Sequence, residues 1–130
     1  MTDISCASLT TCQIAADGSW IRLVFEAADG RPVSLTLPIQ CIQQLLMTLP
    51  QAVSKAICAR HRDDTLRLVF PLGNWKLEQA AGCAGELILT LQTPDGFEVA
   101  FSVDLDAIGQ ISQTAGSTLA TPARNRTYLN

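Results

Sequence analysis

The chain has 130 residues, of which 48% are hydrophobic and only 16% are charged, against about 25% charged residues in an average domain. The net charge of the chain is −3. Without Arg124 and Arg126, which lie near the end, 7 basic and 12 acidic residues remain, so the body of the chain, residues 1–112, has a net charge of −5. A negative body repels phosphate backbones and anionic lipid surfaces, so we expect neither a nucleic-acid partner nor a membrane partner.

The start of the chain and its cysteines favour a cytoplasmic protein. The first residues lack the basic region and apolar stretch of a secretory signal, and no apolar run approaches the roughly 18 residues of a membrane-spanning helix. The five cysteines are too irregularly spaced for a zinc site or a disulfide framework. We therefore expect reduced, mostly buried thiols, no metal and no cofactor. These cysteines are Cys6, Cys12, Cys41, Cys58 and Cys83.

In the first half of the chain, the pattern predicts three strands and one long helix. A short strand is expected over residues 9–15, and strands over 20–26 and 33–37 form a hairpin, because apolar and polar residues alternate around a turn ending at Gly30. From residue 39 to residue 57, apolar residues recur every three or four positions, as on one face of a helix. Pro50 predicts a kink or break near residues 48–50, because an interior proline costs about 3 kcal/mol.

The second half follows a similar plan. Strands are expected over residues 66–70, 75–79, 87–92 and 99–103. Asp104 is a good N-cap for a short helix that stops at Gly116. Residues 117–130 form a tail, whose basic end either frays or adds as a strand to the acidic body or to a partner subunit.

The two halves resemble each other at an offset of 66 residues without gaps. Residues 20–45 align with 86–111, and the turn glycine Gly30 falls on Gly96. Chance similarity between strands is the alternative explanation. The repeat predicts a single domain over residues 1–116, with pseudo-repeats at about 9–60 and 66–115.

We therefore predict an α+β fold: a mainly antiparallel sheet of six to seven strands with two helices on one face, built from a pseudo-two-fold duplicated β-β-(β)-α unit. The helices would cover twelve core-facing residues. The opposite face is mixed in character and is either solvated or a dimer interface. The twelve residues are Ile21, Leu23, Phe25, Val33, Leu35, Leu37, Leu87, Leu89, Leu91, Val99, Phe101 and Val103.

Four residues are weak candidates for a ligand-binding site: Trp20, Trp75, Cys58 and His61. Cys58 and His61 are three residues apart and share a helix face, so a nucleophile pair is geometrically conceivable. The end of a helix disfavours a thiolate, however, and a structural role for Cys58 is the better interpretation. Trp20 and Trp75 either line a pocket or interface, or pack at strand edges.

The functional interpretation follows from the low charge and from the absence of assembled catalytic groups in the sequence. We expect a non-enzymatic homodimeric protein–protein interaction module, resembling an adaptor or chaperone only by analogy of size and charge. The alternative is a small-molecule carrier or sensor with a pocket between the sheet and the kinked helix. A third hypothesis is an enzyme that uses Cys58, His61 or the aspartates.

Overall fold

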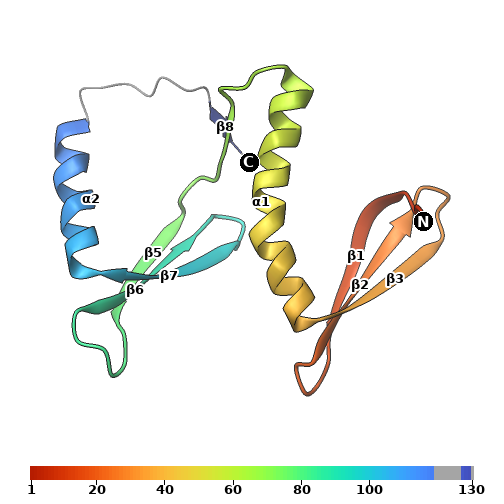
Figure 1. Ribbon diagram of the computed structural model, residues 1–130, viewed down its shortest axis with the longest axis horizontal. Coiled ribbons are helices and arrows are strands. Elements are labelled where there is room, and N and C mark those ends of the chain that lie inside the picture. Colours follow the sequence, from red (N-terminus) through yellow and green to blue (C-terminus); the bar gives the residue numbers. More distant parts are fainter. Residues whose placement is uncertain (119–126, 130) are drawn as a thin grey trace. The chain divides into compact units, whose positions relative to one another are not determined.

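The computed structural model describes residues 1–118 and 127–129, and the chain divides into two compact units (Figure 1). Unit 1 spans Met1–Val53 and unit 2 spans Ser54–Asn130, so the boundary falls inside the long helix. Each unit contains one three-stranded antiparallel sheet. The α+β class is confirmed.

Unit 1 begins with the sheet β1-β2-β3, formed by β1 (Cys6–Ile14), β2 (Trp20–Ala27) and β3 (Pro32–Pro38). The turn between β1 and β2 is held by Asp17, whose Oδ1 accepts hydrogen bonds from the Ser19 amide at 3.1 Å and the Ser19 hydroxyl at 2.6 Å. These bonds stabilise the charged carboxylate and hold the pKa of Asp17 below its ordinary value. The turn between β2 and β3 places Gly30 at a φ of 83°, a conformation that favours glycine.

The helix α1 (Ile39–His61) follows β3 and runs without interruption through Pro50. Of the kink or break expected at residues 48–50, the break is therefore absent. Proline removes a single backbone donor from the helix, and the rest of the apolar stripe still favours helical structure. Just before Pro50, the Thr48 hydroxyl donates to the Gln44 carbonyl at 2.8 Å.

The end of α1 has the two hydrogen bonds of a Schellman motif. The Asp63 amide donates to the Cys58 carbonyl at 3.0 Å, and the Arg62 amide donates to the Ala59 carbonyl at 3.3 Å. This motif puts Arg62 at a φ of 52°, where glycine is the usual residue. The residue that follows the helix, Arg62, thus adopts the left-handed conformation although it is not glycine.

Unit 2 holds the sheet β5-β6-β7 and a separate two-stranded pair. β5 (Asn74–Gln79), β6 (Glu86–Gln92) and β7 (Glu98–Asp104) are antiparallel neighbours, whereas β4 (Arg67–Val69) pairs in parallel with β8 (Thr127–Leu129). The tail therefore contributes a strand to this unit. Arg124 and Arg126 lie outside the described residues. The domain over residues 1–116, with pseudo-repeats at about 9–60 and 66–115, stays a prediction.

The helix α2 (Leu105–Thr118) starts directly after β7. Asp104 caps it, because its Oδ1 accepts a hydrogen bond from the Ala107 amide at 2.6 Å. The Leu105 amide also donates to the Gly85 carbonyl at 3.3 Å, which ties the helix start to the β5–β6 loop. The helix ends two residues beyond Gly116, where the sequence pattern placed its end.

The two sheets have matching registers at the offset of 66. In unit 1, Ile21, Leu23 and Phe25 pair with Leu37, Leu35 and Val33. In unit 2, Leu87, Leu89 and Leu91 pair with Val103, Phe101 and Val99. Each residue of the second set lies 66 positions after its counterpart, so β2-β3 and β6-β7 have the same pairing.

The hydrogen bonds around the sheets repeat at the same offset. Gly30 donates to Ala27 at 2.9 Å and Gly96 to Thr93 at 3.1 Å. Ile39 donates to Ser19 at 3.4 Å, and Leu105 to Gly85 at 3.3 Å. The turn and the start of the helix are thus built alike in both units.

The first strands differ. Pairing between β1 and β2 shifts register between Cys6 and Ser8 and again between Leu9 and Thr11. Pairing between β5 and β6 is regular from Asn74 to Gln79. The irregularities in β1 add residues to one strand without a counterpart on the other, as in a β-bulge.

Two features of the predicted fold are wrong. The strands form two separate three-stranded sheets and a pair, where one sheet of six to seven strands was expected. Within each unit, the helix also leaves the apolar face of the sheet open: α2 contacts β7, the strand it follows, and α1 has no comparable contact with the sheet of unit 1. Alternating patterns specify which residues share a face, but they do not specify which strands join or what covers them.

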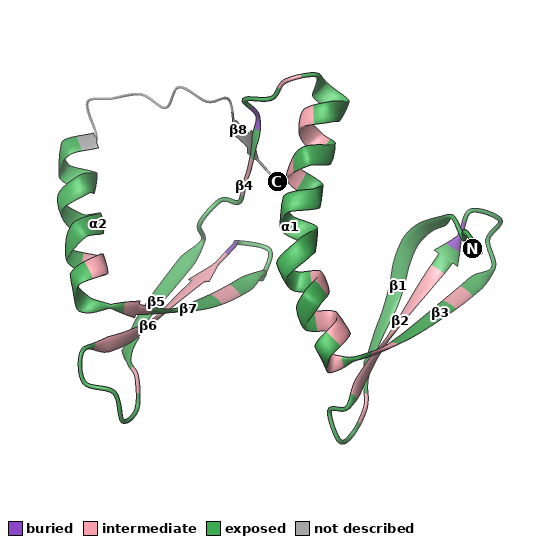
Figure 2. Ribbon diagram, viewed as in Figure 1, coloured by how far each residue is buried: buried purple, intermediate pink, exposed green. Residues whose placement is uncertain are grey.

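The result is a chain with very little buried apolar surface in its described part (Figure 2). Among the described residues, Ala27 and Leu66 are the buried hydrophobic residues, and Thr93 is buried as well. Ten of the twelve expected core residues are half-buried, while Leu35 and Phe101 are exposed. Within each unit, the helix therefore does not cover these residues as predicted.

We predict that Arg62→Gly stabilises the protein by about 1 kcal/mol, because glycine adopts the left-handed conformation without steric cost. Arg60→Gly, two residues earlier within α1, is the matched control and should destabilise by about 1 kcal/mol. Urea denaturation followed by circular dichroism measures both. Equal losses of stability in the two variants would contradict this account of the helix end.

Candidate functional site

The sheet of unit 1 has one entirely apolar face. Side chains of directly paired residues lie on the same side of an antiparallel sheet, so the registers define this face. It carries no charged residue and no amide. Its eleven residues are Cys6, Leu9, Cys12, Ile14, Ile21, Leu23, Phe25, Ala27, Val33, Leu35 and Leu37. We call it the unit 1 face.

The sheet of unit 2 has the equivalent face. Eight of its nine residues are apolar, and Gln79 is the exception. The members are Trp75, Leu77, Gln79, Leu87, Leu89, Leu91, Val99, Phe101 and Val103. We call it the unit 2 face.

Both faces are accessible to solvent, especially on their outer strands. In unit 1, Ile14 is 70% exposed and Leu35 is 48% exposed. In unit 2, Trp75 is 62% exposed and Phe101 is 51% exposed. Contiguous exposed apolar surface of this kind is uncommon on folded monomeric proteins.

The helices have uncovered apolar stripes as well. On α1, Leu46 is 67% exposed, and Leu49 and Val53 are also exposed. On α2, Leu105 and Ile111 are exposed. The helical apolar surface therefore adds to the uncovered surface of the sheets.

The opposite faces of the sheets are polar and internally paired. In unit 1, the Arg22 Nε donates to the Thr36 hydroxyl at 3.1 Å, and the Arg22 guanidinium lies 5.0 Å from the ring centroid of Trp20. In unit 2, the Ser102 hydroxyl donates to the Glu86 carboxylate. These contacts suit a face that remains in water.

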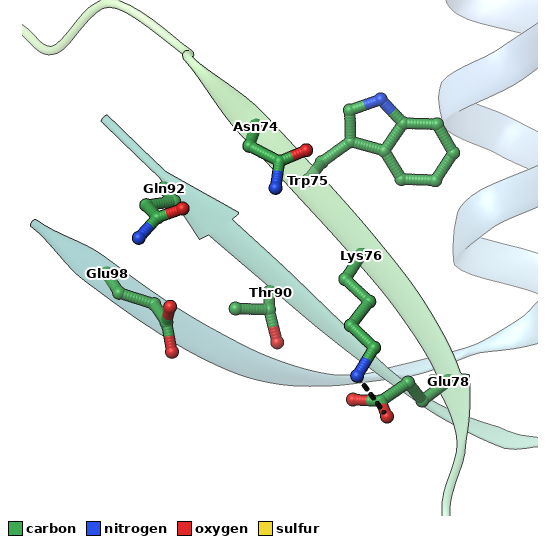
Figure 3. A pocket seen from close by; sticks show the side chains of 7 residues that line it. All are labelled: Asn74, Trp75, Lys76, Glu78, Thr90, Gln92 and Glu98. Atoms are coloured by element: carbon green, nitrogen blue, oxygen red, sulfur yellow. Dashed lines mark ion pairs between the residues drawn. The ribbon is translucent and has the colours of Figure 1, made fainter. Parts of the chain in front are cut away.

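A groove of about 220 Å³ lies on the polar face of unit 2 (Figure 3). Lys76 Nζ lies 2.8 Å from the Glu78 carboxylate, and this hydrogen bond raises the pKa of Lys76 above its ordinary value. Trp75 contributes to the groove, although Figure 3 shows its indole directed away from the other side chains. The complete lining is Asn74, Trp75, Lys76, Glu78, Thr90, Gln92 and Glu98.

Cys58 has a structural hydrogen bond. Its Sγ donates to the Leu66 carbonyl at 3.1 Å, and the side chain is half-buried. A second groove, of about 330 Å³, is lined by Cys58 and by four residues of α1 and the following segment. His61 is exposed at the last position of α1 and is not among the residues of this groove. The four other lining residues are Ser54, Lys55, Ala59 and Asp64.

The two tryptophans lie on opposite kinds of surface. Trp20 starts β2, is half-buried and stacks with Arg22 on the polar face. Trp75 lies on the unit 2 face, opposite Leu91. The candidate residues are therefore spread over several surfaces, and Trp75 alone belongs to an apolar face.

The cysteines are less buried than expected. All five are free, and Cys6, Cys12 and Cys83 are exposed while Cys41 and Cys58 are half-buried. In residues 1–118 and 127–129, no three side chains of the metal-binding types come together. Within the same residues, no helix is long and apolar enough to cross a membrane.

Sequence reasoning identified the apolar residues of β2, β3, β6 and β7 but treated them as an internal core. It missed Leu9, Leu77 and Trp75 as members of the same faces. Alternation in β5 between Trp75, Leu77 and the intervening charged residues was the available signal. In β1 the bulge disturbs the alternation, so the pattern alone could not place Leu9.

No protein-family model, curated protein or solved structure matches this chain.

We predict that iodoacetamide modifies Cys83 at least about tenfold faster than Cys58, because Cys83 is exposed while Cys58 is half-buried and donates to a carbonyl. Peptide mass spectrometry at neutral pH gives both rates in one sample. Faster modification of Cys58 would support a nucleophilic role for that thiol.

Proposed function

We propose that this chain is a non-enzymatic protein–protein interaction module that acts as a homodimer. The observation that carries the proposal is the presence of two contiguous apolar sheet faces that the helices do not cover. Apolar burial is the main favourable term in both folding and association, so faces of this size need a partner. A second copy supplies the same apolar surfaces in equal number.

We further propose that the chain arose by duplication of a β-β-β-α unit. Support comes from the register of four strands and from the turn and helix-start hydrogen bonds, all related by the same offset of 66 residues. The buried residues Ala27 and Thr93 also stand at equivalent positions. Shared strand patterning explains alternation but does not require the same turns and the same link to the helix.

The described side chains give little support to an enzyme. Cys58 donates to a backbone carbonyl, and Asp104 caps α2 through its Oδ1. A carboxylate or thiol held in such a hydrogen bond has a structural role in the fold. The proposal of a non-enzymatic role therefore rests on what these groups already do.

A small-molecule carrier, the alternative proposal, has weaker support. A ligand pocket is ordinarily concave and mostly apolar, with a few polar groups. The groove on β5-β6-β7 is lined mainly by polar and charged residues, and Pro50 is not among them. We therefore prefer the interaction module.

We predict that the protein sediments with twice its chain mass and that Leu35→Lys raises the dimer dissociation constant at least about a hundredfold. Leu35 is an exposed member of the unit 1 face. Burying such a side chain contributes about 1.5–3 kcal/mol, and a symmetric dimer loses this twice. Sedimentation equilibrium over a range of concentrations measures the constant.

Ser34→Lys is the matched control, because Ser34 precedes Leu35 on the same strand and is exposed on the opposite face. It should leave the dissociation constant within about threefold of the wild-type value, since a surface change away from an interface costs little. Circular dichroism checks that both variants retain their strands. A wild-type protein that stays monomeric at high concentration would refute the homodimer.

We predict that dimer formation protects Cys12 from alkylation at least about tenfold, because Cys12 lies on the unit 1 face opposite Leu23. Cys83, exposed outside both faces, is the internal reference. Alkylation rates measured above and below the dissociation constant give the protection. Equal Cys12 rates at the two concentrations would mean that the interface lies elsewhere.

A further inference from the structure

We propose that β4 is a binding site for an extended peptide that carries a carboxylate at the position paired with Arg67. The chain's own strand β8 occupies this site in the structure and exchanges with such a partner. The site is a strand edge in unit 2 and belongs to neither apolar sheet face. The inference therefore goes beyond the proposed homodimer and does not depend on it.

The start of β4 is fixed to the end of α1. Leu66, the residue before the strand, is buried. Its carbonyl accepts a hydrogen bond from the Cys58 thiol at 3.1 Å, and its amide donates to the Asp63 carbonyl at 3.3 Å. The amide of Thr65 also donates to the Asp63 carboxylate, at 3.0 Å. The chain therefore enters β4 from a position that these hydrogen bonds hold.

The segment after β4 is held as well. The rings of Phe70 and Phe97 form an aromatic pair with centroids 5.3 Å apart. The Gly73 amide donates to the Gln92 carbonyl at 2.8 Å, which joins this segment to the end of β6. Both ends of β4 are thus anchored by contacts that do not involve β8. A strand held extended in advance loses little conformational entropy when a peptide adds to its edge.

The present occupant, β8, is held by a short ladder. The pairing is parallel and covers three residues of each strand. Parallel pairing is slightly less stable per residue than antiparallel pairing, and a two-stranded pair by itself is marginally stable in water. A fixed edge with a weakly held strand is the arrangement that permits exchange. The pairs are Arg67 with Thr127, Leu68 with Tyr128, and Val69 with Leu129.

Arg67 determines the chemistry of the preferred partner. Its side chain is exposed, and within the described residues it forms no ion pair. The residue of the chain at the paired position, Thr127, is uncharged. Opposite charges at paired positions of two strands attract, whereas like charges repel. A peptide with glutamate or aspartate at this position therefore binds more tightly than the chain's own sequence.

The experiment titrates the full chain with fluorescein-labelled peptides that have the sequence of residues 124–130. One peptide is unchanged, one carries Thr127→Glu and one carries Thr127→Lys. Fluorescence anisotropy gives the three dissociation constants. We expect the Thr127→Glu peptide to bind at least about fivefold more tightly than the Thr127→Lys peptide, with the unchanged peptide between them.

The protein variant Arg67→Glu should reverse this order of affinities, because it reverses the charge at the paired position. Arg60→Glu is the matched control: Arg60 is an exposed arginine of α1 outside β4, and the change in net charge is the same. It should leave the order unchanged. Circular dichroism checks the fold of both variants. If Arg67→Glu does not fold, Arg67→Ala should bring the two charged peptides to within about twofold of each other, since the charge they distinguish is gone.

The outcomes also separate this inference from the homodimer. Equal affinities for the Thr127→Glu and Thr127→Lys peptides would overturn the inference. The same holds if no peptide binds saturably up to about 1 mM, the effective concentration of a strand joined by a short linker. A monomeric protein that binds the peptides in the expected order would support the inference and refute the homodimer. A dimer that binds none of them would overturn this inference alone.

Discussion

The constraint on which this structure depends is that a sheet with one apolar face must have that face covered. Each unit of the chain builds such a sheet, with Leu23 at the centre of one apolar face and Leu89 at the centre of the other. Burial of apolar side chains is the main source of stability for a small domain, and this protein has few buried side chains within its described residues. In the proposed homodimer, association would therefore also contribute to the stability of the fold.

This constraint also explains why the polar features are weak functional candidates. Arg22 bonds Thr36 across the strands, Lys76 pairs with Glu78, and Asp104 caps a helix. Each charge is matched to a neighbour in its own unit, at or near the solvent, where ion pairs contribute little to stability. The apolar faces are the surfaces for which the described chain offers no such match, and they direct the functional proposal toward association.

The two units resemble each other in strand register, turns and helix starts. Equivalent turns at Gly30 and Gly96 and equivalent helix starts at Ile39 and Leu105 produce two copies of one amphipathic surface. In the proposed homodimer, a second copy of the chain supplies the surfaces that cover them.

The sequence by itself determined the local structure: the alternation around Leu23 and Leu89, the hairpin turns at glycine, and the N-cap at Asp104. These features depend on neighbours in the chain, and local rules describe them well. Of the kink or break expected at Pro50, the break is absent because α1 continues through it. The strand β1 was expected, with Cys12 and Ile14 on one face, but Leu9 was missed because a bulge shifts it onto that face.

Only the tertiary structure decided that the strands form two sheets and that the helices leave the apolar faces open. An alternating strand has the same pattern whether a helix, another sheet or a second chain covers it, because burial is not directional. Most residues of the apolar faces were therefore visible in the sequence, whereas their accessibility was not.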